Sequence, residues 1–241
     1  MGFPLRLAAD LTLGLAARSL RLHRSHPLIL NLVAGGNADD SKSPMIWMGG
    51  PEPLALPETP RVVNSLAAAE RHVFLPTTGL LLRRRIHEFQ PSPHLHLTIC
   101  FDGTEASHDG RAGRQGAFRD ALESIRTARL SGFLLCAQLI LHSASEVAEL
   151  ERLHAELRKR DLDGFLISAS ESAGKDLRSS VAALRRQLLS RRWALLSTLL
   201  DSVRSSQGAT IGRAPHAASG HGRGHAGQMP SRSCEQSVQA P

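Results

Sequence analysis

Cysteine is scarce in this chain of 241 residues. Its three copies, Cys100, Cys136 and Cys234, are odd in number and far apart, so we expect no disulfide framework. Because disulfides persist mainly in oxidising compartments, this composition favours a reducing, cytoplasmic setting. The cysteines share no spacing typical of a metal site, and neither do His216, His221 and His225 near the C-terminus, so we predict no metal-ligating residues.

Long apolar runs and tyrosine are also missing. No apolar run approaches the roughly 18 residues of a membrane span, and the N-terminal stretch lacks the compact apolar core and small-residue cleavage site of a secretory signal. The formal charge is +7, but there is no Tyr and only 4% of the residues are aromatic. Because basic residues interleaved with aromatic ones are typical of base-stacking proteins, we do not expect a nucleic-acid partner.

Residues 1–26 are predicted to form an amphipathic helix. Leu5, Leu7, Ala8, Leu11, Leu15 and Leu22 can share much of one side, while Arg6, Arg18, Arg21 and Arg24 supply positive charge. Such a helix packs on its own domain or contacts an anionic membrane surface. Both alternatives stay open, so the protein is expected to be cytoplasmic or peripheral to a membrane.

Six short apolar runs give the chain its main pattern, and most are separated by helical patterns. The runs are residues 27–33, 45–50, 72–79, 94–103, 132–142 and 164–170. Strands that alternate with helices favour a parallel α/β sheet or barrel with its chemistry at the C-terminal strand ends. Glycine and polar residues gather at those ends, namely Gly49-Gly50, Thr77-Thr78-Gly79, Asp102-Gly103 and Ser168–Ser170.

The fourth run has two distinct sides. Leu95, Leu97, Ile99 and Phe101 suit packing against helices, and His94, His96, Thr98, Cys100 and Asp102 point the other way. In a barrel this second row would line the interior.

The connection between the first two runs does not fit a full repeat. A parallel crossover needs about a dozen residues and is usually helical, whereas residues 34–44 are rich in Gly, Asn, Asp, Ser and Pro. The first βα unit is therefore truncated, or these two strands are not parallel neighbours.

The C-terminal third changes character. Residues 175–203 are expected to be one long helix or a broken pair, with Leu184, Leu188, Leu195 and Leu199 as the apolar side. Residues 204–241 have too few apolar side chains to offset their ordering entropy and are predicted to be disordered. The expected organisation is thus an N-terminal helix (1–26), a partial barrel (27–174), a helical segment (175–203) and a tail (204–241).

Several motifs together resemble the radical S-adenosylmethionine (radical SAM) family. "GGPEPLALPE" resembles its Gly-Gly-Glu-Pro segment, "LPTTGLLL" its Thr-Asn-Gly-Leu-Leu segment, and the region from "FDGTEASHDG" onward its Asp-Gly…His-Asp segment. "HPLILNL" and "FQPSPHLHLTICFDG" are most similar to the hopanoid-biosynthesis branch, which transfers an adenosyl group to a polyprenoid hydrocarbon. The resemblance covers residues 1–170 and implies a partial (β/α) barrel, S-adenosylmethionine and a [4Fe-4S] cluster.

The chain departs from the family where the chemistry would occur. The family holds its cluster with a Cys-x3-Cys-x2-Cys loop after the first strand, and thiolate ligands are what such clusters require. No cysteine precedes Cys100, and Pro51 interrupts the glycine segment. We therefore predict that the cluster is absent and assign no catalytic residue. The resemblance leaves as cofactor-binding candidates Gly49, Gly50, Glu52, Thr77, Thr78, Asp102 and His108.

Two of these residues have simpler roles that the sequence also allows. Glu52 can cap or hydrogen-bond a loop, and Asp102-Gly103 can shape a turn. Three functions stay open: an active adenosyl transferase acting on a polyprenoid lipid, a catalytically inactive relative that acts through binding, and the product of a damaged reading frame. The expected partners are a lipid substrate or membrane surface, or an active paralogue.

Overall fold

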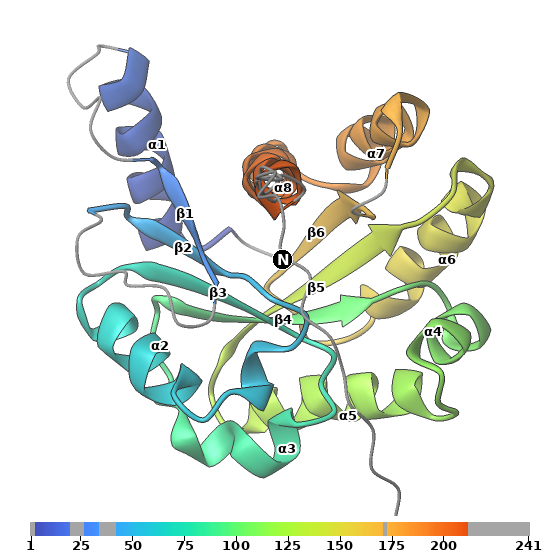
Figure 1. Cartoon of the computed structure of the whole chain (residues 1–241), viewed down its shortest axis with the longest axis horizontal. Helices are drawn as coiled ribbons and strands as arrows, with labels where there is room; N and C mark the ends of the chain where they lie inside the picture. The colour runs from blue at the N-terminus through green and yellow to red at the C-terminus, as the bar shows by residue number, and fades with distance from the viewer. Residues whose placement is uncertain (1–2, 20–26, 34–41, 171–172, 212–241) are drawn as a thin grey trace, which may run out of the picture.

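The computed structural model describes residues 3–19, 27–33, 42–170 and 173–211 and is built on a curled parallel sheet (Figure 1). The strands are β1 (Ile29–Leu32), β2 (Met45–Met48), β3 (His72–Thr77), β4 (Leu95–Phe101), β5 (Leu134–Leu141) and β6 (Gly164–Ala169). They lie side by side in the order in which they occur in the sequence, and each neighbouring pair is parallel. The expected α/β partial barrel is confirmed.

Helices cover the outer face of this sheet (Figure 1). They are α2 (Thr59–Ala68), α3 (Leu82–Arg85), α4 (Glu105–Ala112), α5 (Ala117–Leu130) and α6 (Val147–Leu157), with the short turns η1 (Pro53–Ala55), η2 (Ile86–Glu88) and η3 (Ala144–Glu146). The larger core cluster lies between them and the sheet. It includes Leu95, Leu97, Ile99 and Phe101 of β4, so the side that was expected to face helices does so.

Two further helices, α1 (Leu5–Ser19) and α8 (Arg191–Ile211), lie on the inner, concave face. α7 (Lys175–Leu188) lies next to α6, and its Val181 and Leu184 belong to the larger core cluster. α1 and α8 bury Leu7, Leu11, Trp193, Leu196 and Leu200 against the inner side chains of the sheet. An aromatic side chain at the centre of such a cluster buries a large apolar area. The space that the missing strands of a closed barrel would enclose is therefore filled by the chain itself.

α7 and α8 also satisfy the open edge of the sheet. The Ser197 hydroxyl donates to the Ile167 carbonyl and accepts from the Ile167 N–H, both at 2.8 Å. Arg185 is buried; its Nε donates to the same carbonyl at 2.7 Å and its Nη2 pairs with Asp201 at 2.8 Å. Because an unpaired strand edge is a liability, these contacts make α8 part of the fold.

Three buried histidines lie at the opposite, N-terminal end of the strands. His72 Nδ1 is 3.2 Å from His96 Nε2, and His72 Nε2 is 2.9 Å from a carboxylate oxygen of Asp10 in α1. The ring of His94 lies 4.9 Å from that of His72, and His96 stacks on Phe74. Burial lowers the pKa of His96 to about 3, so this group stays neutral. The inner row of β4 is thus partly aromatic packing.

β1 and β2 are parallel neighbours, with Ile29 opposite Met45 and Leu32 opposite Met48. This excludes the alternative in which the two strands are not adjacent, and a shortened first βα unit remains. The connection is residues 33–44, close to the minimum for a parallel crossover; residues 34–41 lie outside the described part.

The C-terminal helices are a broken pair, and their apolar sides differ in part from the prediction. α7 buries Val181 and Leu184, but Leu195 of α8 is 40% exposed. Leu184, Leu188 and Leu199 pack against the core clusters as predicted, and only Leu195 does not, because the break at 189–190 resets the helical phase. α8 also continues to Ile211, past residue 204, because extending a formed helix costs far less than starting one. The rest of the predicted tail lies outside the described residues.

α1 also differs from expectation. Leu7, Ala8 and Leu11 are buried, but Leu5 is 83% exposed, so it does not share their side. The part of the predicted helix that contains Leu22, Arg21 and Arg24 lies outside the described residues. No helix in the described part of the chain is both long and apolar enough to cross a bilayer.

Candidate functional site

The glycine pair follows the end of β2 and is shaped by its neighbours. Gly49 N–H donates to the Leu32 carbonyl at 2.7 Å, and a Cβ added at Gly49 would meet Asn31 Oδ1 at 2.4 Å. Gly50 has φ of 108° with open space where a side chain would stand. This backbone region is strained for other residues, so the pair forms a turn whose backbone an external group can approach.

Glu52 joins the ends of β2 and β3. Its Oε2 accepts from Thr77 Oγ1 at 3.1 Å, from Thr78 N–H at 2.9 Å and from Thr78 Oγ1 at 2.8 Å, while Oε1 accepts from Leu54 N–H at 3.3 Å. Three of the candidate residues therefore meet at one carboxylate. Its oxygens already serve protein donors, which is the loop-bonding role that the sequence allowed for Glu52.

Asp102 organises a second group at the end of β4. Its Oδ1 accepts from His142 Nε2 at 2.8 Å, and its N–H donates to His108 Nδ1 at 3.1 Å. Arg111 donates to the Asp102 carbonyl and pairs with Glu146. The side chains of His142 and Asp102 are about one third exposed, so a solute can reach this pair.

His108 is a supporting residue. It is 3% exposed and packs against the rings of Phe101 and Phe118. Burial lowers its pKa, opposed by the nearby carboxylates of Asp102 and Asp109. A neutral imidazole that accepts a backbone N–H through Nδ1 keeps its proton on Nε2, so His108 holds the Asp102 turn in place.

A row of polar side chains crosses the inner face between these groups. Cys100 Sγ is 3.3 Å from Gln138 Oε1, and Gln138 Nε2 donates to Ser168 Oγ at 2.8 Å. Arg204 of α8 reaches the same region, with its guanidinium 5.7 Å from the centre of the Trp47 ring. Desolvation raises the pKa of Cys100 to about 12, with Arg204 lowering it and Asp102 and Glu52 raising it further. The two carboxylate groups thus act on one thiol.

Sequence reasoning missed Gln138 and His142. The signal was present, because alternate residues of a strand point to the same face and Gln138 pairs in register with Cys100. The fifth run therefore has two sides like the fourth, with Gln138 and His142 on the same side.

The described cysteines do not fit an iron–sulfur cluster. Cys100 and Cys136 lie on neighbouring strands of the inner face, and burial raises the pKa of both thiols. A cluster needs several thiolates that converge on one point, and these two groups stay protonated. Within the described residues, no three His, Cys, Asp or Glu side chains are arranged to hold a metal ion. Cys234, His216, His221 and His225 lie outside them.

Comparison with known proteins relates this fold to solved structures. No family model matches the chain, and no curated protein matches it. SuiB of Streptococcus suis bound to S-adenosylmethionine has a similar structure, with a TM-score of 0.55 and 12% identity over 78% of this chain. SuiB bound to the precursor peptide SuiA gives 0.50 and 11% over 78%. The chain covers 51% and 52% of those two chains, about half their length. The fold is a radical-SAM-like partial barrel.

Proposed function

We propose that this protein is a catalytically inactive, radical-SAM-like protein of hopanoid or related lipid metabolism, which binds S-adenosylmethionine without cleaving it. The observation that carries the proposal is the state of the thiols. Reductive cleavage in the family needs an electron from a thiolate-bound cluster. In this chain the connection between β1 and β2 contains no cysteine, and the two described thiols are kept protonated by burial.

The strand-end rim supports retained binding. Gly50 leaves its backbone open to an approaching group, and Glu52 fixes the ends of β2 and β3 against each other. Polar groups at the C-terminal ends of parallel strands are the usual binding position in such folds. The similar structure of SuiB bound to S-adenosylmethionine supports this ligand as the first to test.

The lipid branch rests on sequence alone. "HPLILNL" and "FQPSPHLHLTICFDG" are the segments that resemble hopanoid-biosynthesis proteins. The second segment includes β4 and ends at Asp102-Gly103, so it supplies much of the site described above.

Calorimetry and product analysis test the two halves of the proposal separately. We expect heat on titration with S-adenosylmethionine, and no 5′-deoxyadenosine after anaerobic reconstitution with iron and sulfide and reduction with dithionite. Formation of 5′-deoxyadenosine would contradict inactivity, and a titration without heat at several temperatures would contradict binding.

A matched pair of variants locates the binding site. Gly50→Ala and Gly116→Ala both place a side chain at positive φ, 108° and 81°, where nothing lies within 4 Å. Both substitutions therefore add backbone strain, on the order of 1–3 kcal/mol, without a steric clash. We expect Gly50→Ala to weaken S-adenosylmethionine binding at least tenfold and Gly116→Ala to leave it unchanged. Equal effects would place the ligand elsewhere.

A further inference from the structure

The outer surface of α1 carries an apolar stripe that the fold does not use. Leu5 is 83% exposed and Leu13 is 68% exposed, and both point away from the buried side formed by Leu7 and Leu11. Ala9 and Ala16 are exposed at intervals of three and four residues from them, so the four side chains share one face. Leu5 and Leu13 therefore present apolar surface to the solvent.

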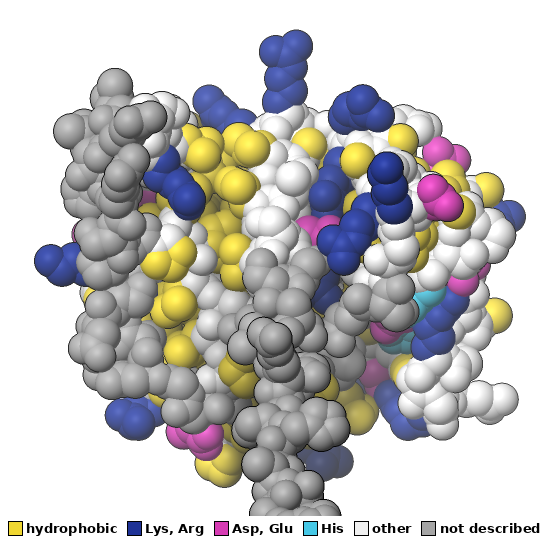
Figure 2. Space-filling view, turned by 45° about the horizontal axis from the view of Figure 1, so that its top comes forward, with side chains coloured by type: hydrophobic (Ala, Val, Ile, Leu, Met, Phe, Trp, Pro, Cys, Tyr) yellow, Lys and Arg dark blue, Asp and Glu magenta, His cyan; other side chains and the backbone are white. Residues whose placement is uncertain are grey.

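The apolar surface continues beyond α1. Leu195 of α8 is 40% exposed, and Figure 2 shows apolar side chains between α1 and α8 with Lys and Arg around them. Beside α1 lies a cavity of about 300 Å³, whose lining includes Leu13, Gly14, Ala17, Leu28, Arg18 and Lys42. Apolar surface with cations at its rim is typical of an interfacial site.

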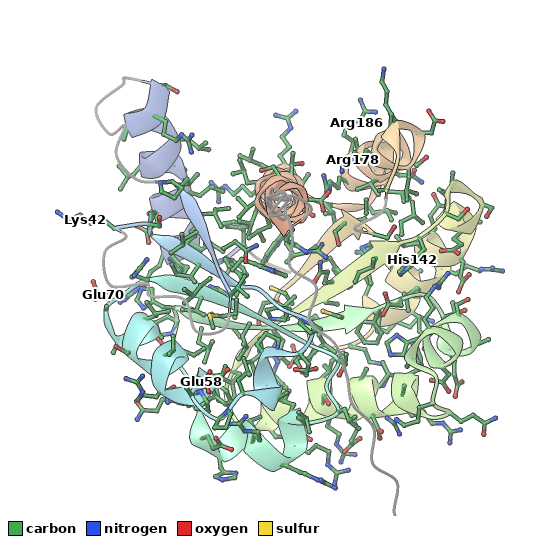
Figure 3. All side chains as sticks on the ribbon, in the orientation of Figure 1. Lys42, Glu58, Glu70, His142, Arg178 and Arg186 are labelled. Carbon is green, nitrogen blue, oxygen red and sulfur yellow. The ribbon has the colours of Figure 1, made fainter. Side chains whose placement is uncertain are left out.

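The exposed charge on this side of the molecule is almost entirely positive. Eight exposed cations lie on α1, α7 and α8 and just before β2. They are Arg6, Arg18, Lys42, Lys175, Arg178, Arg186, Arg191 and Arg192. Among the acids of these elements, Asp10 pairs with His72 and Asp201 pairs with Arg185. Asp176 is the one exposed acid among their described residues. In Figure 3, Lys42 extends from the α1 side and Arg178 and Arg186 lie on α7, whereas Glu58 and Glu70 lie near α2.

The helices of the outer face differ in charge: α3 carries Arg83, Arg84 and Arg85, whereas α6 is acidic. α6 carries Arg152 with Glu149, Glu151 and Glu156. The α1–α8–α7 face thus differs from α6 by its near lack of exposed acids. A cationic face attracts anionic partners through long-range electrostatics.

We propose that the α1–α8–α7 face docks on the surface of an anionic lipid bilayer. The exposed leucines favour lipid over nucleic acid, because phosphate contacts need cations but gain nothing from leucine side chains. Leu5, Leu13 and Leu195 enter the boundary between headgroups and acyl chains, and the surrounding arginines bind lipid phosphates. The proposal uses none of the residues assigned to S-adenosylmethionine binding, so the two proposals can fail separately.

Vesicle co-sedimentation of the full chain tests the proposal. We expect binding to vesicles of phosphatidylglycerol and phosphatidylcholine in equal parts, and little binding to phosphatidylcholine alone. Raising the salt from about 0.1 M to about 1 M shortens the Debye length from about 10 Å to about 3 Å and should release the protein. Absence of binding to the anionic vesicles, or equal binding to both kinds, would overturn the proposal.

Two pairs of variants assign the face. The double variant Arg191→Gln/Arg192→Gln should weaken vesicle binding about fivefold for each charge, about 25-fold together. Its control is Arg158→Gln/Lys159→Gln, at two exposed residues after α6, which should change binding much less. Leu5→Gln with Leu13→Gln should weaken binding at least tenfold, whereas Leu130→Gln, at a side chain 80% exposed on α5, should not. Equal effects within either pair would refute the assigned face, and a circular-dichroism melt checks that each variant is folded.

Nucleic acid is tested as a competitor. If the face binds lipid through both charge and leucine, a duplex oligonucleotide should compete only at low salt, and the Leu5→Gln/Leu13→Gln variant should bind the duplex like the wild type. Loss of duplex binding in that variant would contradict the proposed division of roles.

Discussion

Replacing Gly164 by alanine should drive α8 away from the sheet. Gly164 is the first residue of β6 and faces Trp193 of α8. A Cβ at this position would stand 2.0 Å from Trp193 Cζ2, 2.2 Å from Cε2 and 2.5 Å from Cη2. Carbon atoms pack at about 3.5–4.0 Å, so the indole has to retreat by about 1.5 Å or more. Trp193 is 4% exposed and has little room to do so.

The size of the effect depends on how the indole responds. If the ring shifts within the core, overpacking costs about 1–3 kcal/mol. If the ring leaves, the loss of about 150–250 Å² of buried area at about 25 cal/mol per Å² costs about 4–6 kcal/mol. We therefore expect Gly164→Ala to lower the free energy of unfolding by about 2–5 kcal/mol.

Urea denaturation followed by tryptophan fluorescence measures this cost. The protein has two tryptophans, Trp47 and Trp193, and both are buried in the inner cluster, so emission reports directly on α8 packing. Gly110→Ala is the control, because Gly110 lies in α4 with open space around it and alanine should be neutral or stabilising there.

A second background isolates the contact. In Trp193→Leu the clash disappears, so Gly164→Ala should cost less than about 1 kcal/mol. An equal cost in both backgrounds, or no cost in the wild type, would refute the packing of α8 on the inner face.

Three further predictions concern the histidines, the thiols and Glu52. His96 stays neutral in the folded protein, whereas in the unfolded chain it takes up a proton below its ordinary pKa of about 6.5. The free energy of unfolding therefore falls as the pH drops toward 3, and at pH 5 the loss from His96 is about 2 kcal/mol. Urea midpoints at pH 7 and pH 5 measure it, and a His96→Gln variant with unchanged pH dependence would contradict this origin. Cys100 is partly buried and has a pKa of about 12, so about one thiol in ten thousand is ionised at pH 8. Mass spectrometry after iodoacetamide treatment should therefore find it unmodified in the folded protein, and rapid alkylation would argue against the raised pKa. Glu52→Ala leaves the buried Thr77 hydroxyl without its acceptor, whereas the exposed Thr78 donors can bond to water. The substitution should cost about 1–3 kcal/mol in urea denaturation and Glu52→Gln should cost less; equal costs would show that the acceptor does not matter.

Local patterns predicted much of this fold because they are governed by local physics. The alternation in residues 94–102 identified the two faces of β4, since successive strand residues point in opposite directions. The glycines at 49 and 50 marked a turn because few other residues tolerate the backbone found at Gly50.

Features that depend on distant contacts could not be predicted in the same way. The adjacency of β1 and β2 depends on how the whole sheet curls, and the composition of their connection left two alternatives. The packing of α8 inside the sheet depends on Gly164 and Trp193, which lie 29 positions apart in the printed sequence; neither residue alone indicates the contact.

The candidate site was predicted in part for the same reason. The meeting of Glu52 with Thr77 and Thr78 follows from placing adjacent strand ends together, and the polar ends were predicted as the site. The pairing of Asp102 with His142 needed the register between β4 and β5, which the sequence does not state.

Bound iron per chain is the most direct measurement of the central claim. The protein is purified anaerobically, reconstituted with iron and sulfide, desalted and measured for iron and for the cluster's electron paramagnetic resonance after reduction. The account predicts iron well below one atom per chain and no cluster signal, because the two described thiols lie on different strands and desolvation raises the pKa of both. About four irons per chain, with the signal of a reduced four-iron cluster, would contradict it.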